Sequence, residues 1–417
     1  MKRLLFVFVF IFGAVGMSMG FSAAEESADA LLLEEVLREV VAQNPEILAA
    51  KGRSLAARER IPQAWALDDP QFGITRWEFP ANFNILKANE TWYTLSQQFP
   101  FFGKRGLRGK MADLERAAAD EEFRAVSLRT VRLAKQAYDD LFLARKLLEI
   151  HHDQVDLARK FSQIAQEKFA VGEAGQQDLL RARMELLNLS NAVITLEQER
   201  ESAAARLNIL MNRPVSGLLG VPQAPTLPSS IPEMEALQGD AEETRSENRI
   251  GALAVQRGEE AIKLAKRDRF PDLTAEVGFM DMHDREHNAW MATVRINIPW
   301  VNRKKYDARI RENEAEQSRA EAAYRSAVNE SRFKIKDLWT RFEASKRLAD
   351  LYQDGILPLA EQSLESALIG YQTGKNDFLT LIDAQRNLKE AETTYFRALA
   401  DADKRLAELE EMVGREF

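Results

Sequence analysis

Hydrophobic residues at every second position predict two pairs of short strands in this chain. The first pair lies near residues 71–79 and 91–99, and the second lies within residues 272–298. The alternation is clearest in the second pair. One strand places on one face Leu273, Ala275, Val277 and Phe279. Its partner places on one face Trp290, Ala292, Val294, Ile296 and Ile298. Each pair is therefore expected to form a hairpin with one apolar and one polar face.

Very long helices are predicted after each strand pair. Residues 105–171 and 304–373 hold no helix breaker except Pro358 with nearby Gly355. At 1.5 Å per residue such a helix reaches about 100 Å, which no single compact domain accommodates. A heptad then begins after each helix, at Leu179, Ala182, Leu186, Leu189, Val193 and Leu196, and at Leu381, Ala384, Leu388, Ala391, Tyr395 and Ala398. These seams predict coiled-coil hairpins over 105–211 and 304–412.

The second half of the chain repeats the first at an offset of about 200 residues. The strand-to-helix junction at residues 95–105 returns at 294–304, and the hairpin tip at 169–172 returns at 371–374. Two anchors at nearly the same offset indicate an internal duplication.

The domain organisation follows from this repeat. Residues 1–24 carry a basic start, a short apolar run and a small-residue site, the pattern of a secretory signal peptide. We expect a first repeat at 25–213, with its β-hairpin at 71–99, and a second at 233–417. Five prolines mark residues 214–232 as the linker between the repeats.

Composition narrows the classes of function. The chain has no cysteine, which excludes disulfides and thiolate chemistry, and its net charge of −8 argues against a nucleic-acid partner. No Gly-rich phosphate loop and no Ser-His-Asp spacing stands out, so we expect neither an enzyme nor a cofactor.

Four strands of about nine residues have the length and alternation of tilted membrane strands, yet four cannot close into a barrel. Three chains would supply twelve strands. The expected fold is mainly α with a small β part, in which a trimeric 12-stranded β-barrel continues into an α-helical barrel. Aromatic residues flank the strands as at membrane interfaces, including Phe101, Phe102 and Trp300.

The duplicated layout, the segment Ser96-Gln-Gln-Phe-Pro-Phe-Phe-Gly-Lys-Arg105 and the two hairpin tips resemble the TolC family of outer-membrane efflux ducts, and particularly its heavy-metal and cation efflux branch. The resemblance spans the whole mature chain. It implies a passive homotrimeric duct in the outer membrane with a long periplasmic extension. The partners it implies are a periplasmic adaptor protein, an inner-membrane efflux pump and outer-membrane lipid.

Two alternatives stay open at this stage. One is the outer-membrane component of type I protein secretion, because the cargo cannot be deduced from a wide lumen. The other is a periplasmic coiled-coil adaptor or scaffold that enters no membrane. Adaptors usually carry one helical hairpin and several β-domains, whereas this chain has two hairpins and four strands.

The same resemblance implies two groups of functional residues. Val171, Gly172, Thr373 and Gly374 would dock the adaptor at the hairpin tips, although glycines there also suit an ordinary turn between helices. Asp178, Tyr371 and Asp383 would form a periplasmic gate, with Asp178 bonded to Tyr371 and Asp383 in an acidic ring; these acids also suit solvated helix positions. Thr380 replaces a second acid of that ring.

A weaker candidate is a metal site. Met282, His283 and His287 combine thioether and imidazole groups that suit soft or borderline metals. They lie between two predicted strands, in what the resemblance makes an extracellular loop.

Overall fold

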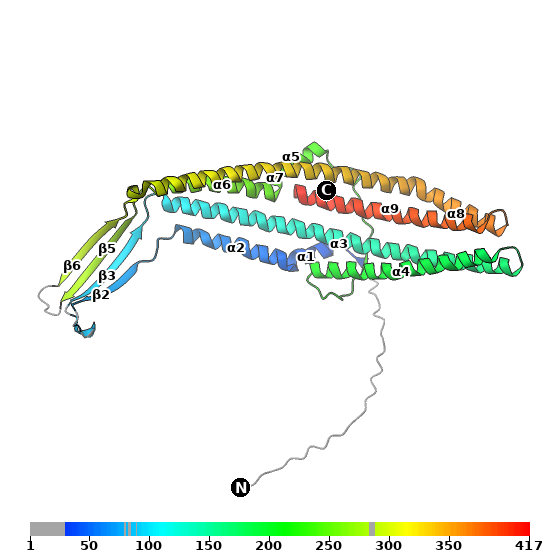
Figure 1. The fold of residues 1–417 in the computed structure, drawn as a ribbon, viewed down its shortest axis with the longest axis horizontal. Helices are drawn as coiled ribbons and strands as arrows, with labels where there is room; N and C mark the ends of the chain where they lie inside the picture. Colours follow the sequence, from blue (N-terminus) through cyan, green and yellow to red (C-terminus); the bar gives the residue numbers. More distant parts are fainter. Residues whose placement is uncertain (1–29, 79–80, 82–84, 89, 283–287) are drawn as a thin grey trace, which may run out of the picture.

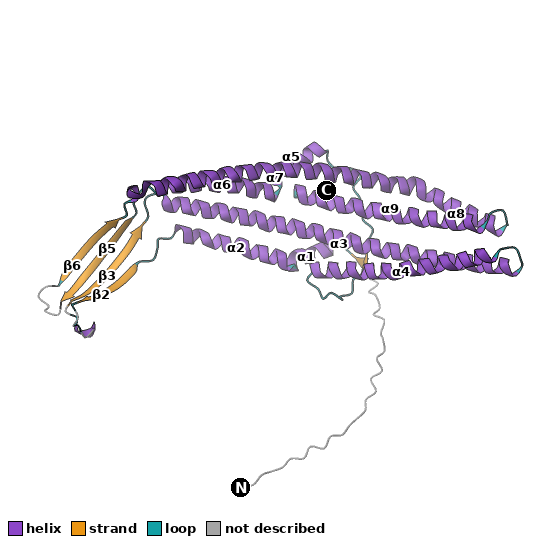
Figure 2. Cartoon of the chain, in the orientation of Figure 1, coloured by secondary structure: helices purple, strands orange, loops and turns teal. Residues whose placement is uncertain are grey.

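The molecule is a long body of helices with a small β-sheet at one end (Figures 1 and 2). The computed structural model describes residues 30–78, 81, 85–88, 90–282 and 288–417. The expected signal peptide at 1–24, together with His283 and His287, lies outside these residues.

The described part of the first repeat holds four helices: α1 (Leu33–Gln43), α2 (Pro45–Trp65), α3 (Lys104–Ala170) and α4 (Gln176–Leu210). The Asn44 side chain accepts hydrogen bonds from the backbone N–H groups of Glu46 and Ile47. Pro45 has no backbone N–H, and the first position of a helix has no acceptor for one. Asn44 and Pro45 therefore end α1 and start α2 directly after it.

The second repeat holds α5 (Met234–Thr244), α6 (Ser246–Arg267), α7 (Arg303–Leu351), α8 (Leu357–Gln372) and α9 (Phe378–Val413). One turn of π-helix at Tyr352–Ile356 joins α7 to α8, and the Leu357 N–H donates to the Tyr352 carbonyl. Pro358 has no N–H, so the helix widens there without ending. Within the described residues, none of the helices has the length and apolar character needed to cross a membrane.

The sheet consists of four antiparallel strands in the order β2 (Gln71–Trp77), β3 (Glu90–Phe99), β5 (Leu273–Met282) and β6 (Ala289–Ile296). Short 3₁₀ turns, η1 (Ile85–Lys87) and η2 (Pro299–Asn302), lie beside it. Its register aligns the predicted faces: one cross-strand row is Phe72, Leu95, Val277 and Ala292, and the next is Ile74, Tyr93, Phe279 and Trp290. The apolar face is confirmed, and it is uncovered in this chain.

A second, two-stranded sheet was not expected from the sequence. β1 (Ala30–Leu31) pairs in parallel with β4 (Val221–Pro222). The Tyr138 hydroxyl of α3 donates to the Leu31 carbonyl at 2.7 Å and accepts from the Gln223 N–H at 2.8 Å. The start of the described chain and the proline-rich connection are thereby fixed to the middle of α3.

The helices lie side by side in a single curved layer with two parts. Next to the sheet the order is α2, α3, α6, α7, and further away α3 lies between α4 and α9. The predicted heptad positions form the contacts, since Ala182, Leu189, Leu196, Leu381 and Ala391 are all buried. The seams therefore hold each returning helix against its long partner.

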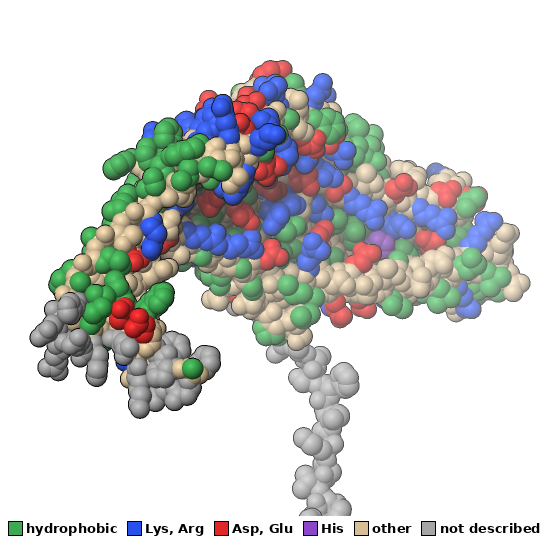
Figure 3. All heavy atoms as spheres, turned by 60° about the vertical axis from the view of Figure 1, so that its left-hand side comes forward, with side chains coloured by type: hydrophobic (Ala, Val, Ile, Leu, Met, Phe, Trp, Pro, Cys, Tyr) green, Lys and Arg blue, Asp and Glu red, His purple; other side chains and the backbone are tan. Residues whose placement is uncertain are grey.

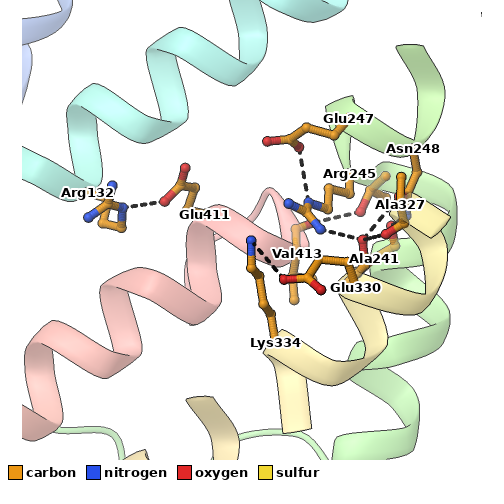
Figure 4. A network of polar contacts seen from close by, with 12 residues as sticks. Arg132, Ala241, Arg245, Glu247, Asn248, Ala327, Glu330, Lys334, Glu411 and Val413 are labelled. Atoms are coloured by element: carbon orange, nitrogen blue, oxygen red, sulfur yellow. Dashed lines mark hydrogen bonds and ion pairs between the residues drawn. The ribbon is translucent and has the colours of Figure 1, made fainter. Parts of the chain in front are cut away.

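Polar contacts lie at mid-length, both within the second repeat and between the two repeats. Arg245, between α5 and α6, donates to Glu247, as Figure 4 shows. Arg245 also donates to the Ser331 side chain of α7. Ser331 also donates to Asn248 at 3.1 Å. In the same view Arg132 of α3 forms an ion pair with Glu411 of α9.

Charged groups also lie inside the contact between α3 and α9. Lys135 binds Glu410 at 2.6 Å, and Lys404 binds Asp140 at 2.6 Å. Asp139, which is buried, faces Asp403. Burial raises the pKa of Asp139 to about 9, and the charge of Asp403 adds to the shift. One carboxyl of this pair therefore stays protonated at neutral pH.

Candidate functional site at the hairpin tips

The first tip is a glycine turn that closes α3. Gly172 has φ +80°, and its N–H donates to the Phe169 carbonyl at 3.1 Å. The Glu173 N–H donates to the Lys168 carbonyl at 2.8 Å, which completes a Schellman motif. Val171, which precedes the glycine, has 71% of its surface exposed.

The second tip repeats this geometry after α8. Gly374 has φ +72°, its N–H donates to the Tyr371 carbonyl, and the Lys375 N–H donates to the Gly370 carbonyl. Thr373 is exposed. Here the next helix is also capped: the Asp377 carboxylate accepts from the side chain and the backbone N–H of Thr380, which lowers the pKa of Asp377. Thr380 is thus a capping partner.

The two tips lie together at the end of the molecule opposite the sheet (Figure 1). A single apolar cluster binds the hairpins just behind them, built from all four helices that reach this end: Phe161, Ala165, Ala182, Ala367, Tyr371, Phe378, Leu381, Ile382 and Ala384. The tips therefore present two fixed turns of the same shape, side by side.

Tyr371 lies inside this cluster with 4% of its surface exposed. Its ring meets Phe378 edge to face, with 5.3 Å between the ring centroids. Its hydroxyl has no hydrogen-bond partner among the described residues, so the expected bond to Asp178 is not formed within this chain. Burial raises the pKa of Tyr371, and the negative charge of nearby Asp178 adds to the shift.

Asp383 is exposed on α9, one turn before Arg386. Arg386 binds Glu185 of α4 at 2.5 Å, and only 7% of the Glu185 side chain is exposed. The hydrogen bond to Glu185 raises the pKa of Arg386, and the negative charges of Glu185 and Asp383 add to the shift. A cation therefore stands close to the proposed acidic ring and weakens its field.

Sequence reasoning missed Glu185, Arg386 and Lys168. The Lys168 ammonium lies 5.3 Å from the centre of the Tyr371 ring, a cation–π contact between the hairpins. Glu185 could have been noticed, because it directly precedes the heptad residue Leu186 and follows Ala182 by one turn of the same face. Lys168 had no such signal.

Only Met282 of the weak metal candidate lies within the described residues. Met282 ends β5, and its N–H donates to the Asn288 side chain at 3.0 Å. Its expected companions His283 and His287 lie outside the described residues. In the part of the chain that the structure describes, no cluster of three or more His, Asp or Glu side chains suits a metal ion.

Comparison with known proteins decides the family. The model of the outer membrane efflux protein family matches residues 36–213 and again 240–415, once for each repeat. The chain belongs to this family. As an efflux-family protein it lies in the outer membrane and extends into the periplasm.

Individual relatives agree with this assignment. The efflux-family chain is 23% identical over 402 residues to the cobalt-zinc-cadmium resistance protein CzcC of Cupriavidus metallidurans, covering 94% of this chain and 91% of CzcC. It is 21% identical over 406 residues to the outer membrane protein TolC of Vibrio cholerae, covering 92% and 90%. The crystal structure of CusC shares the fold with a TM-score of 0.78, at 18% identity and 92% coverage of each chain.

Proposed function

We propose that three copies of this chain form one passive duct across the outer membrane and the periplasm. The sheets join edge to edge into a 12-stranded barrel, and the helices continue it as a tube. An inner-membrane pump delivers cargo through a periplasmic adaptor, which docks on Val171, Gly172, Thr373 and Gly374. The duct itself uses no energy and performs no chemistry.

The observation that carries this proposal is the sheet. Its apolar rows are uncovered, with Phe72 at 66% and Val294 at 68% exposure, and its edge strands β2 and β6 have no partner within the described chain. Apolar surface and open edges of this size are costly in water. A closed ring of sheets in lipid removes both costs, since it pairs the edges and turns the apolar face to the bilayer.

Extraction and gel behaviour test the assembly. We expect the protein in the outer-membrane fraction, released only by detergent, as a trimer that dissociates on heating. Release by osmotic shock as a soluble protein would instead support a periplasmic scaffold.

For the cargo we propose metal cations. The support is the similarity to CzcC over nearly the whole of both chains. Deletion of the gene should lower the cobalt, zinc and cadmium concentrations that stop growth, and the intact gene should restore them. An unchanged tolerance to all three metals would leave drug efflux or protein secretion as the function.

A further inference from the structure

A basic cavity of about 520 Å³ lies where the helices meet the sheet. It opens between the first turns of α3 and the last turns of α6. Its cations are Lys110 from α3 and Lys263, Lys266 and Arg267 from α6, and no carboxylate is among its described lining residues. Four positive charges around one open cavity favour an anion.

Two of these cations are already engaged. Lys263 binds Glu260 at 2.8 Å, and the Arg267 guanidinium donates to the Phe102 carbonyl at 3.1 Å. Lys110 and Lys266 are exposed and form no ion pair with the described carboxylates. Their ammonium groups are the ones available to a ligand.

The backbone adds to the positive field. Gly103, which lines the cavity, precedes α3 in the left-handed conformation with φ +87° and offers no side chain to cap the helix. A Cβ at Gly103 would lie 3.5 Å from the Arg267 guanidinium. The Arg267 guanidinium therefore lies beside the N-terminal end of α3, and both favour negative charge.

The remaining wall is apolar and continues toward the sheet. Leu107 and Phe270 line the cavity. The Phe270 ring stacks on Phe101, with 4.7 Å between centroids, and Phe101 meets Phe102 edge to face. Phe270 is 48% and Phe102 86% exposed. Figure 3 shows Lys and Arg side chains on the helices beside the hydrophobic group at this junction. A ligand suited to this wall carries apolar chains beside its charge.

The position of the cavity keeps it open in an assembled ring. The strands that adjoin it, β3 and β5, are the two central strands of the sheet, and α3 and α6 are the two central helices of that part of the body. Copies that join through β2 and β6 meet at the two edges of the sheet, away from the central elements that line the cavity.

We propose that this cavity binds the headgroup phosphate of an anionic phospholipid from the leaflet that borders the periplasm. The phosphate lies between Lys110 and Lys266, and the acyl chains run past Phe270 and Phe102 toward the apolar face of the sheet. The inference rests on the proposed insertion of the sheet in the membrane. It adds a specific lipid at the boundary between barrel and tube.

Native mass spectrometry of the detergent-extracted protein tests it, with phosphatidylglycerol, phosphatidylcholine and inorganic phosphate as probes. The double variant Lys110→Gln with Lys266→Gln should bind phosphatidylglycerol on the order of thirtyfold more weakly than the unchanged protein. The matched control is Lys51→Gln with Lys160→Gln, two exposed helix lysines outside the cavity, which should bind as the unchanged protein does.

Each other outcome has a defined meaning. Equal binding of phosphatidylglycerol by the cavity variant and the control overturns the site. Binding of inorganic phosphate as tight as that of phosphatidylglycerol assigns the cavity to a free anion and overturns the lipid. A protein that fractionates with the outer membrane but fails these tests contradicts this inference alone, whereas a soluble protein contradicts the proposed duct.

Discussion

Tyr371 keeps a hydroxyl group inside an apolar cluster without any described hydrogen-bond partner. A buried polar group left unpaired costs about 1–3 kcal/mol. No described contact within one chain offsets this cost. We therefore expect the hydroxyl to find its hydrogen-bond partner in another copy of the chain. A neighbouring copy in the proposed trimer would bring further helices to the tips, and Asp178 is close enough to act on Tyr371 electrostatically.

Tyr371→Phe tests this gate. Removing an unpaired hydroxyl should leave the folded chain at least as stable as before, because the cost of burying that group is lost with it. The loss of a closing bond in the trimer should raise single-channel conductance in planar bilayers. Tyr395→Phe is the control, because the Tyr395 hydroxyl binds Gln353 at 3.2 Å elsewhere. Equal conductance of both variants and the unchanged protein would remove Tyr371 from the gate.

Asp383→Asn tests the acidic ring. Three copies near one axis would attract cations, so the variant should show weaker cation selectivity in reversal-potential measurements. We expect a mild effect, since Thr380 is not an acid and Arg386 lies one turn away. Asp401→Asn, on the same helix and also exposed, should not change selectivity. A similar change in both variants would indicate a general effect of net charge.

The pair Asp139 and Asp403 makes stability depend on pH. The ordinary pKa of an aspartate is 3.8, and that of Asp139 is about 9, so between these values the native state holds a proton that the unfolded chain has released. Native stability should therefore fall as pH rises from about 4 to about 9, by up to about 1.4 kcal/mol per pH unit.

Thermal unfolding in detergent at several pH values measures this fall. Asp139→Asn imitates the protonated carboxyl and should flatten the dependence, whereas Asp156→Asn, at an exposed position that binds Arg159, should keep it. A Tm that is constant with pH in the unchanged protein would show that the pair holds no proton.

At the scale of helices and strands, regular elements were predictable and their exceptions were not. The heptad seams and the strand faces follow periods that a sequence displays, and the burial of Leu189 and the register of Val277 agree with them. The break expected at Pro358 is one π-helical turn, because neighbouring contacts hold the helix together across it.

The short parallel pair β1 and β4 had no signal in the sequence, because two residues are too few to show a period.

The candidate site could be predicted only in part. The glycine turns at Gly172 and Gly374 were readable from residue type, since left-handed turns favour glycine. The contacts of Glu185 with Arg386 and of Lys168 with Tyr371 join helices distant in sequence. Only the packing of the hairpins brings these side chains together.

Bulky substitution at the tips tests adaptor docking. A side chain at Gly172 or Gly374 would meet no neighbouring atom, but it would strain a backbone with positive φ by about 1–2 kcal/mol. We expect Gly172→Leu or Gly374→Leu to abolish efflux while trimers remain in the membrane. Gly239→Leu is the control, since that glycine of α5 also faces open space. Normal metal tolerance in both tip variants would contradict docking there.

At the scale of the whole molecule, the sheet faces determine which way the barrel is turned. Val294 is on the apolar face opposite Ala275, and Thr293 is on the polar face opposite Glu276. Val294→Arg should place a charge in lipid at a cost of about 2–4 kcal/mol near the midplane and reduce trimer yield in membranes. Thr293→Arg should be tolerated. The reverse result would show that the apolar face turns inward.

The two edge strands of the sheet differ in sequence, because β2 comes from the first repeat and β6 from the second. Copies can then join only head to tail, as a monomer with two unlike reactive ends adds to a growing polymer. A copy with one blocked edge is a chain terminator: it adds through its good edge and prevents closure. In a cell that makes intact and blocked copies equally, random mixing leaves about one ring in eight wholly intact. Such a defect would be dominant over the intact gene.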